Sequence, residues 1–253
     1  MLSTLVNAGR VLDQFTVERP EWGVTELAAA LGMSKSNAHA LLATLSEIGL
    51  LKRTDQGRYH LGWRLLTLNH VLLHSTAFRA EARPVMSRLV ERFGETTHLG
   101  VLQDGQVMYV DKLQGTQAVR VMTDMGVRLP AHCSGVGKAL LSGLSEAEVE
   151  AIAASKGLPA FTPGTITTLE ELKSELARVR RRGYAYDIEE VIPELCCVAA
   201  PIRDGAGKVV AALSISAPFY RFRAKKREYR EAVLAAVEEI SRRLAETRGE
   251  LVG

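Results

Sequence analysis

The stretch from residue 24 to residue 61 constrains the fold of this chain most, because two short helical patterns joined by a tight turn are followed at once by a hairpin pattern. The first helix begins near Thr25 and stops at Gly32, and the second is capped by Ser34 and closed by Gly49. Small and apolar residues fall where two crossing helices need them, with a glycine where the turn becomes left-handed. This spacing predicts a helix-turn-helix, although an ordinary helical hairpin inside a core would share it.

A candidate wing follows the second helix directly. Residues 50–54 and 58–61 read as two short strands around Asp55, Gln56 and Gly57, which form a glycine-containing hairpin loop. Apolar residues recur at three- and four-residue intervals from Leu2 to Phe15 and predict a further amphipathic helix that ends before Pro20. Residues 1–62 are therefore predicted to form a winged helix-turn-helix of three helices and a β-hairpin wing.

The polar face of the second helix has the chemistry of a DNA-reading surface. Asn37 can read adenine and Ala40 can contact a thymine methyl group in the major groove, while the amides that begin the helix suit a phosphate. The basic residues of the hairpin can straddle the DNA backbone, or can equally protect a solvated strand edge. The predicted DNA-binding residues are Ser34, Lys35, Ser36, Asn37, His39, Ala40, Lys52, Arg53 and Arg58.

A second domain follows a linker. Residues 63–76 predict a helix too apolar for a solvated linker, and we expect it to pack against a second subunit. Residues 77–253 mix helical and strand patterns, which predicts an α+β domain. Its expected helices lie at 79–93, near 135, 147 and 169, and at 228–247, and its expected strands at 98–103, 107–113, 119–123, 184–188, 197–202 and 209–216.

Length and charge agree with this organisation. A chain of 253 residues is long enough for two domains, each with its own core. The net charge is only +3, so binding to nucleic acid must come from locally placed cations. No apolar run approaches the roughly 20 residues of a membrane span, and three cysteines suggest no disulfide framework. These features predict a cytoplasmic protein without membrane contact.

The motifs of both domains resemble those of the IclR family of transcription regulators. The resemblance rests on SKSNAHALL at 34–42, LGWRL at 61–65, GVRLPAHCSGVGKA at 126–139, GYAYDIEE at 183–190 and CVAAPI at 197–202. It implies a GAF-like α/β effector-binding domain with an antiparallel sheet. Two positions depart from the family: Ala40 stands where arginine is frequent, and Pro193 with Glu194 stands where glycine is frequent.

Two strands of the second domain predict a binding pocket. Alternation places Ala212, Ser214 and Ser216 on one strand face, and Leu195 with Cys197 on another. A few polar groups on an apolar wall suit a small polar ligand. A glycine-rich turn from His132 to Lys138 opens a helix whose amides favour a carboxylate. The expected effector is therefore a small carboxylate, or a hydroxy or aromatic acid.

The resemblance carries over further effector-binding positions. With His132 from the glycine-rich turn, the predicted set is Ala118, Val121, His132, Gly135, Val136, Asp187, Leu195, Cys197, Ser214 and Ser216. Taken singly, Cys197 could equally be a small core residue, Ser214 and Ser216 satisfied strand hydroxyls, and Asp187 a turn or cap residue.

Two other functions compete with the regulator. A hydrolytic enzyme would use Cys197 as nucleophile, His132 as base and Asp187 to orient it, but no family signature surrounds them. A metal-dependent sensor would combine these residues with Cys133, but without a closely spaced ligand pair. We therefore expect no catalytic residues, no metal and no cofactor. The expected partners are double-stranded DNA with a palindromic operator, a small-molecule effector, and a second copy of the chain in a dimer or a dimer of dimers.

Overall fold

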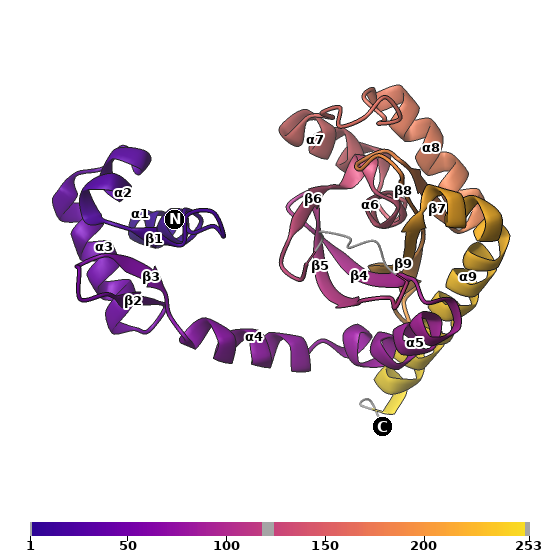
Figure 1. Cartoon of the computed structure of the whole chain (residues 1–253), viewed down its shortest axis with the longest axis horizontal. Helices are drawn as coiled ribbons and strands as arrows, with labels where there is room; N and C mark the ends of the chain where they lie inside the picture. Colours follow the sequence, from indigo (N-terminus) through magenta and orange to yellow (C-terminus); the bar gives the residue numbers. More distant parts are fainter. Residues whose placement is uncertain (1, 118–123, 251–253) are drawn as a thin grey trace. The chain divides into compact units, whose positions relative to one another are not determined.

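The computed structural model describes residues 2–117 and 124–250 (Figure 1). The chain divides into two compact units, Met1–Ser75 and Thr76–Gly253. The predicted strand at 119–123 and the candidate residues Ala118 and Val121 lie outside the described residues. No helix of the described chain is both long enough and apolar enough to cross a membrane.

The first unit is the predicted winged helix-turn-helix. Gly32 takes a left-handed conformation (φ 63°) and ends α2, which allows the tight turn before α3. A three-stranded sheet with strand order β1-β3-β2 packs beside the helices. The strand β1 was not predicted; it is two residues long and pairs Trp22 with Tyr59. The elements are α1 (Ser3–Leu12), β1 (Glu21–Trp22), α2 (Val24–Leu31), α3 (Lys35–Glu47), β2 (Leu51–Arg53), β3 (Tyr59–Leu61) and α4 (Arg64–His74).

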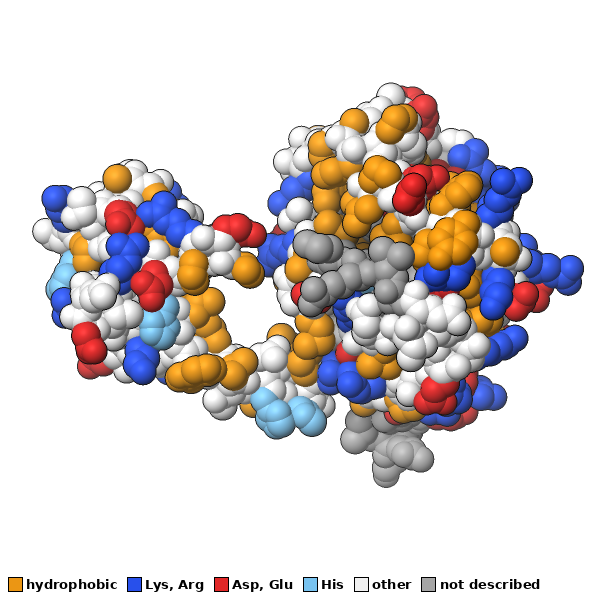
Figure 2. Space-filling model, in the orientation of Figure 1, with side chains coloured by type: hydrophobic (Ala, Val, Ile, Leu, Met, Phe, Trp, Pro, Cys, Tyr) orange, Lys and Arg blue, Asp and Glu red, His pale blue; other side chains and the backbone are white. Residues whose placement is uncertain are grey.

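The start of α4 is fixed to the end of α3. Arg64 Nη1 donates a hydrogen bond to the carbonyl oxygen of Ile48, the residue that caps α3, at 2.6 Å. Gly62 lies so close to the backbone of Gly49 that a side chain at this position would clash with it. Beyond this joint, α4 has no buried residue. Its apolar side chains are exposed, as Figure 2 shows, and include Leu66, Leu68, Val71 and Leu72.

The second unit is built on a six-stranded antiparallel sheet with the strand order β6-β5-β4-β9-β8-β7. Two helices, α5 and α9, cover one face, and the remaining helices lie toward the other (Figure 1). The elements are α5 (Ala77–Phe93), β4 (Thr96–Gln103), β5 (Gln106–Leu113), β6 (Arg128–Pro130), a 3-10 turn (Ala131–Cys133), α6 (Gly135–Leu141), α7 (Glu146–Lys156), α8 (Leu169–Arg182), β7 (Ala185–Ile188), β8 (Leu195–Arg203), β9 (Val209–Pro218) and α9 (Phe219–Glu250).

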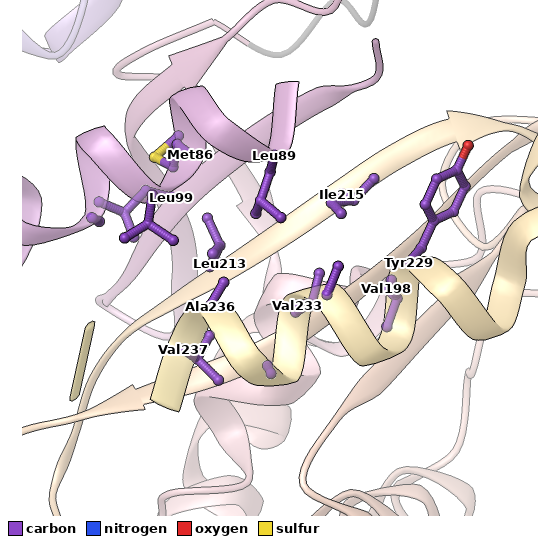
Figure 3. Packing of buried hydrophobic residues seen from close by; sticks show 14 of the residues in the cluster. Met86, Leu89, Leu99, Val198, Leu213, Ile215, Tyr229, Val233, Ala236 and Val237 are labelled. Atoms are coloured by element: carbon purple, nitrogen blue, oxygen red, sulfur yellow. The ribbon is translucent and has the colours of Figure 1, made fainter. Parts of the chain in front are cut away.

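A large apolar core fixes α5 and α9 on the sheet. Met86 and Leu89 of α5, and Val233 of α9, meet side chains of the central strands such as Leu213 and Ile215 (Figure 3). This packing uses one side of each strand, because successive strand residues point to opposite faces. The other side of β8 and β9 is therefore free to carry the candidate ligand-binding residues.

The predicted α+β class and the two-domain architecture are confirmed, and the differences are local. The edge strand β6 was not predicted, and α9 begins at Phe219 rather than near Glu228. The backbone of Lys225 is non-helical inside α9 (φ −117°), so the pattern before this kink does not continue the periodicity after it.

Candidate DNA-binding face and effector pocket

The free side of α3 presents the predicted DNA-reading residues together. The side chain of Ser34 caps the helix and accepts a hydrogen bond from the backbone amide of Asn37 at 3.2 Å. The opposite side is buried through Ala38, Leu41, Leu42 and Leu45. This orientation exposes Ser34, Lys35, Ser36, Asn37, His39 and Ala40 to solvent.

The three basic residues predicted on the hairpin differ in their contacts. Lys52 and Arg53 are exposed on β2, where Lys52 is the cross-strand partner of His60. Arg58 instead turns toward the helices, and its Nη1 and Nη2 each donate to the carboxylate of Glu26 at 3.0 Å. The guanidinium groups of Arg58 and Arg19 lower the pKa of Glu26 to about 2. In the described part of the chain, Arg58 is thus engaged in an ion pair, whereas Lys52 and Arg53 make none.

A pocket in the second unit gathers predicted residues from three neighbouring strands. Asp187 on β7 is the cross-strand partner of Cys197 on β8, and Cys197 is the partner of Ser216 on β9. Ser214 lies two residues before Ser216, on the same face. The pocket is lined by His98, Tyr109, Leu129, Ser134, Asp187, Val191, Ile192, Leu195, Cys197, Ser214 and Ser216.

Several residues of this lining were not predicted from the sequence, among them His98 and Tyr109. His98 lies in the pocket because β4 pairs with β9, and this pairing places His98 opposite Ser214. The imidazole of His98 lies 5.1 Å from the ring of Tyr109, and its Nδ1 is 3.4 Å from Ser216 Oγ. Only the strand order could have revealed this, because His98 and Ser216 are far apart in the sequence.

Burial controls the ionisation of the lining. It raises the pKa of Asp187 to about 7, against the opposing effect of the Glu190 backbone amide, which donates to Asp187 Oδ1 at 2.8 Å. It lowers the pKa of His98 to about 3 and raises the pKa of the Cys197 thiol well above its usual value. At neutral pH the lining therefore offers a neutral imidazole, a protonated thiol and a carboxyl group near the middle of its titration.

Gly135 and Val136 support the wall of the pocket from behind. A methyl group on Gly135 would lie 2.6 Å from Cys197 Sγ, so only glycine fits against the thiol. Val136 is buried in the apolar cluster between the sheet and the helices that follow. The structure thus places both residues next to the pocket lining without making them part of it.

His132 and the predicted anion-binding turn differ from expectation. His132 lines a separate pocket beside α7, and its Nε2 lies 3.1 Å from the carbonyl oxygen of Pro159. The 3-10 turn at Ala131–Cys133 directs it there. The amide of Gly137, at the start of α6, donates to Ser134 Oγ at 3.0 Å. This amide is therefore already committed within the chain.

The geometry separates the groups that the alternative functions require. His132 and Cys197 line different pockets, so the proposed base does not face the proposed nucleophile. The raised pKa of Cys197 also keeps its thiol protonated. Among the residues that the structure describes, no three His, Cys, Asp or Glu side chains gather closely enough to hold a metal ion.

Comparison with known proteins identifies the family. Residues 70–242 match the family described as "Bacterial transcriptional regulator IclR C-terminal", and residues 4–55 match "IclR helix-turn-helix domain". The chain therefore belongs to the IclR family of bacterial transcriptional regulators, which have a DNA-binding domain followed by an effector-binding domain.

Individual relatives agree over nearly the whole chain. The HTH-type transcriptional regulator XynR of Escherichia coli is 36% identical over 85% of this chain and 86% of that protein. The transcriptional repressor IclR of Escherichia coli is 32% identical over 95% of this chain and 89% of that protein. An IclR homologue from Microbacterium hydrocarbonoxydans, whose crystal structure contains 4-hydroxybenzoate, is 31% identical and superposes with a TM-score of 0.83, covering 95% of this chain and 98% of that one.

Proposed function

We propose that this protein is a repressor of a catabolic operon, and that a small organic acid bound in the second unit controls its affinity for DNA. The observation that carries the proposal is the row formed by Asp187, Cys197 and Ser216 across three strands, which faces a pocket. It gains support from a relative that is named a repressor and from another that is complexed with 4-hydroxybenzoate.

The lining defines the class of effector. Leu129, Ile192 and Leu195 offer apolar contact, while hydroxyl and carboxyl groups are placed at the sheet. No lysine or arginine belongs to the described lining. Within this described lining a carboxylate binds through hydrogen bonds, and protonated Asp187 can donate one. A hydroxy acid or aromatic acid satisfies both the polar and the apolar parts.

The first unit supplies the DNA contacts in this proposal. We assign residues 1–62 to DNA binding, residues 63–76 to the linker and residues 77–253 to effector binding. The exposed face of α3 enters the major groove, where Asn37 and Ala40 contact bases. Lys52 and Arg53 contact phosphates next to the groove.

The proposed assembly is a homodimer, or a dimer of dimers, on a palindromic operator. The exposed apolar residues of α4 offer a self-complementary contact, and a symmetric operator requires paired reading heads. Light scattering at micromolar concentration tests this assembly, and a monomer would contradict it.

The central experiment begins with selection of operator sequences from random duplex DNA by the purified full-length protein. The selected duplex is then titrated, by fluorescence anisotropy, with protein in the presence of a panel of small hydroxy and aromatic acids. We expect one palindromic sequence and at least one acid that changes its affinity. Neutral analogues of the active acid, such as the primary amide, serve as controls. Selection of no sequence above random would contradict the proposed function.

A further inference from the structure

A buried ion pair connects the two parts of the chain that enclose the pocket. Lys138 on α6 donates from Nζ to Oε1 of Glu190, which follows β7. The two side chains are only 2% and 9% exposed. Neither residue belongs to the described lining of the pocket. Their pairing is therefore a contact within the protein rather than part of that lining.

Each partner of the pair is attached to a wall of the pocket. Lys138 belongs to the helix that begins after Ser134, a lining residue, and that presses Gly135 against Cys197. The backbone amide of Glu190 donates to Asp187 Oδ1 at 2.8 Å, and Val191 next to it lines the pocket. Holding Glu190 in place thus also orients Asp187.

The segment from 189 to 194 needs such a restraint. Glu189 and Glu194 both take left-handed conformations (φ 59° and 62°), which residues other than glycine rarely adopt. Hydrogen bonds hold both ends of the segment. Thr162 Oγ1 and Thr165 Oγ1 each donate at 2.6 Å, to the carbonyl oxygens of Glu189 and Glu190, and the backbone amide of Glu194 donates to Glu189 Oε2 at 2.8 Å. The ion pair of Glu190 adds a charged side-chain contact that ties this segment to α6.

Stability alone does not account for the pair. A buried ion pair is often no more stabilising than apolar residues of the same size. This pair is also incompletely satisfied, because Glu190 Oε2 is buried and has no hydrogen-bond partner among the described residues. A pair of opposite charges does, however, fix one geometry between two elements.

We propose that Lys138 and Glu190 are positioning residues, whose ion pair latches residues 189–194 over the pocket and holds Asp187 toward the effector. This inference rests on the proposed function only in naming the pocket as the effector site. The latch itself has a readout that needs no effector, because Cys197 lies inside the pocket and Cys196 faces the opposite core.

The test measures the rate at which methyl methanethiosulfonate modifies each cysteine of the full-length protein. Because Cys196 and Cys197 are adjacent and share one peptide, fragment ions in tandem mass spectrometry assign the modification to one or the other. The variants are Glu190→Gln, Lys138→Met and the double variant Lys138→Met with Glu190→Met. The double variant replaces the ion pair with two apolar side chains of similar size, so it should fold even where the single variants, which leave one buried charge unpaired, are destabilised. Glu95→Gln is the matched control, because it weakens another buried ion pair, with Arg221, in the same unit.

We expect the ratio of Cys197 to Cys196 modification rates to rise at least tenfold in the double variant, and to stay at the wild-type value in Glu95→Gln. An unchanged ratio in the double variant overturns the latch, both when the two rates rise equally, as global unfolding would cause, and when neither rate changes. Protection of wild-type Cys197 by 4-hydroxybenzoate is measured in parallel. If 4-hydroxybenzoate does not protect Cys197, the result counts against this compound as an effector. The latch is judged only by the ratio of the two modification rates.

Discussion

Asp187 on β7 and Cys197 on β8 stand directly opposite each other, so a carboxyl group and a thiol share one buried face of the sheet. Burial raises the pKa of both groups, and the Asp187 carboxylate raises the pKa of the Cys197 thiol further. The pair therefore makes both the pocket and the stability of the second unit sensitive to pH.

The first prediction concerns the pH dependence of stability. The pKa of Asp187 is about 7 in the folded protein, above its usual value of 3.8. A carboxyl with a raised pKa stabilises the fold fully below the unfolded value, and this contribution is lost as pH rises toward 7. We expect Asp187→Asn to remove a pH-dependent loss on the order of 3 kcal/mol between pH 4 and pH 7. Urea unfolding of both proteins across this range checks it, and parallel pH profiles would contradict it.

The second prediction concerns effector response. Asp187→Ala and Ser214→Ala should raise the effector concentration needed for half-maximal response by roughly five- to hundredfold, the loss expected for one buried hydrogen bond. Affinity for the operator without effector should stay within about twofold, because both residues belong to the second unit and allosteric coupling is a difference in ligand affinity between states. Anisotropy titrations give both quantities. If either variant lost affinity for the operator in the absence of effector, the assignment of these residues to effector binding would be contradicted.

The third prediction separates the cations of the hairpin. Lys52→Ala and Arg53→Ala should weaken binding to all duplexes, and each should reduce the slope of log affinity against log salt by about 1. Asn37→Ala should instead change base preference. Arg58→Ala is the matched control, because its guanidinium is committed to Glu26; it should lower the unfolding temperature and leave the salt slope unchanged. If Arg58→Ala reduced the salt slope as much as Lys52→Ala and Arg53→Ala do, Arg58 would also contact phosphate and the prediction would be wrong.

The fourth prediction tests the close contact between Gly135 and Cys197. Gly135→Ala would place a methyl group 2.6 Å from Cys197 Sγ, so we expect it to destabilise the second unit by about 1 to 3 kcal/mol. Adding Cys197→Ala removes the sulfur and should recover most of this loss. Denaturant unfolding of the two single variants and the double variant gives the coupling free energy. Additive effects would mean that the two residues are not in contact.

Local patterns in the sequence predicted the elements and the residues of single strands. Alternation along one strand was enough to place Ser214 and Ser216 on a common face, and helical periodicity placed Ser36 and Ala40 opposite the buried stripe, with Asn37 beside them. Both depend only on neighbours within one element. The same reasoning fixed the order of elements in the winged helix-turn-helix.

Contacts between distant elements could not be predicted in this way. His98 reaches the pocket through the pairing of β4 with β9, and Arg58 meets Glu26 across the first unit. His132 was assigned to the pocket because it precedes a glycine-rich turn, but one 3-10 turn directs it to another cavity. The register of the sheet and the rotation of a short turn depend on the tertiary packing.

The hydrogen bond from Arg64 to Ile48 makes the start of α4 a joint with the end of α3. The 11 residues of α4 form a lever about 16 Å long at about 1.5 Å per residue. A rotation of about 10° at this joint moves the far end of the lever by roughly 3 Å, close to the rise of one DNA base pair. A small change of angle at one hydrogen bond is thus amplified into a displacement of roughly 3 Å at the far end of the helix.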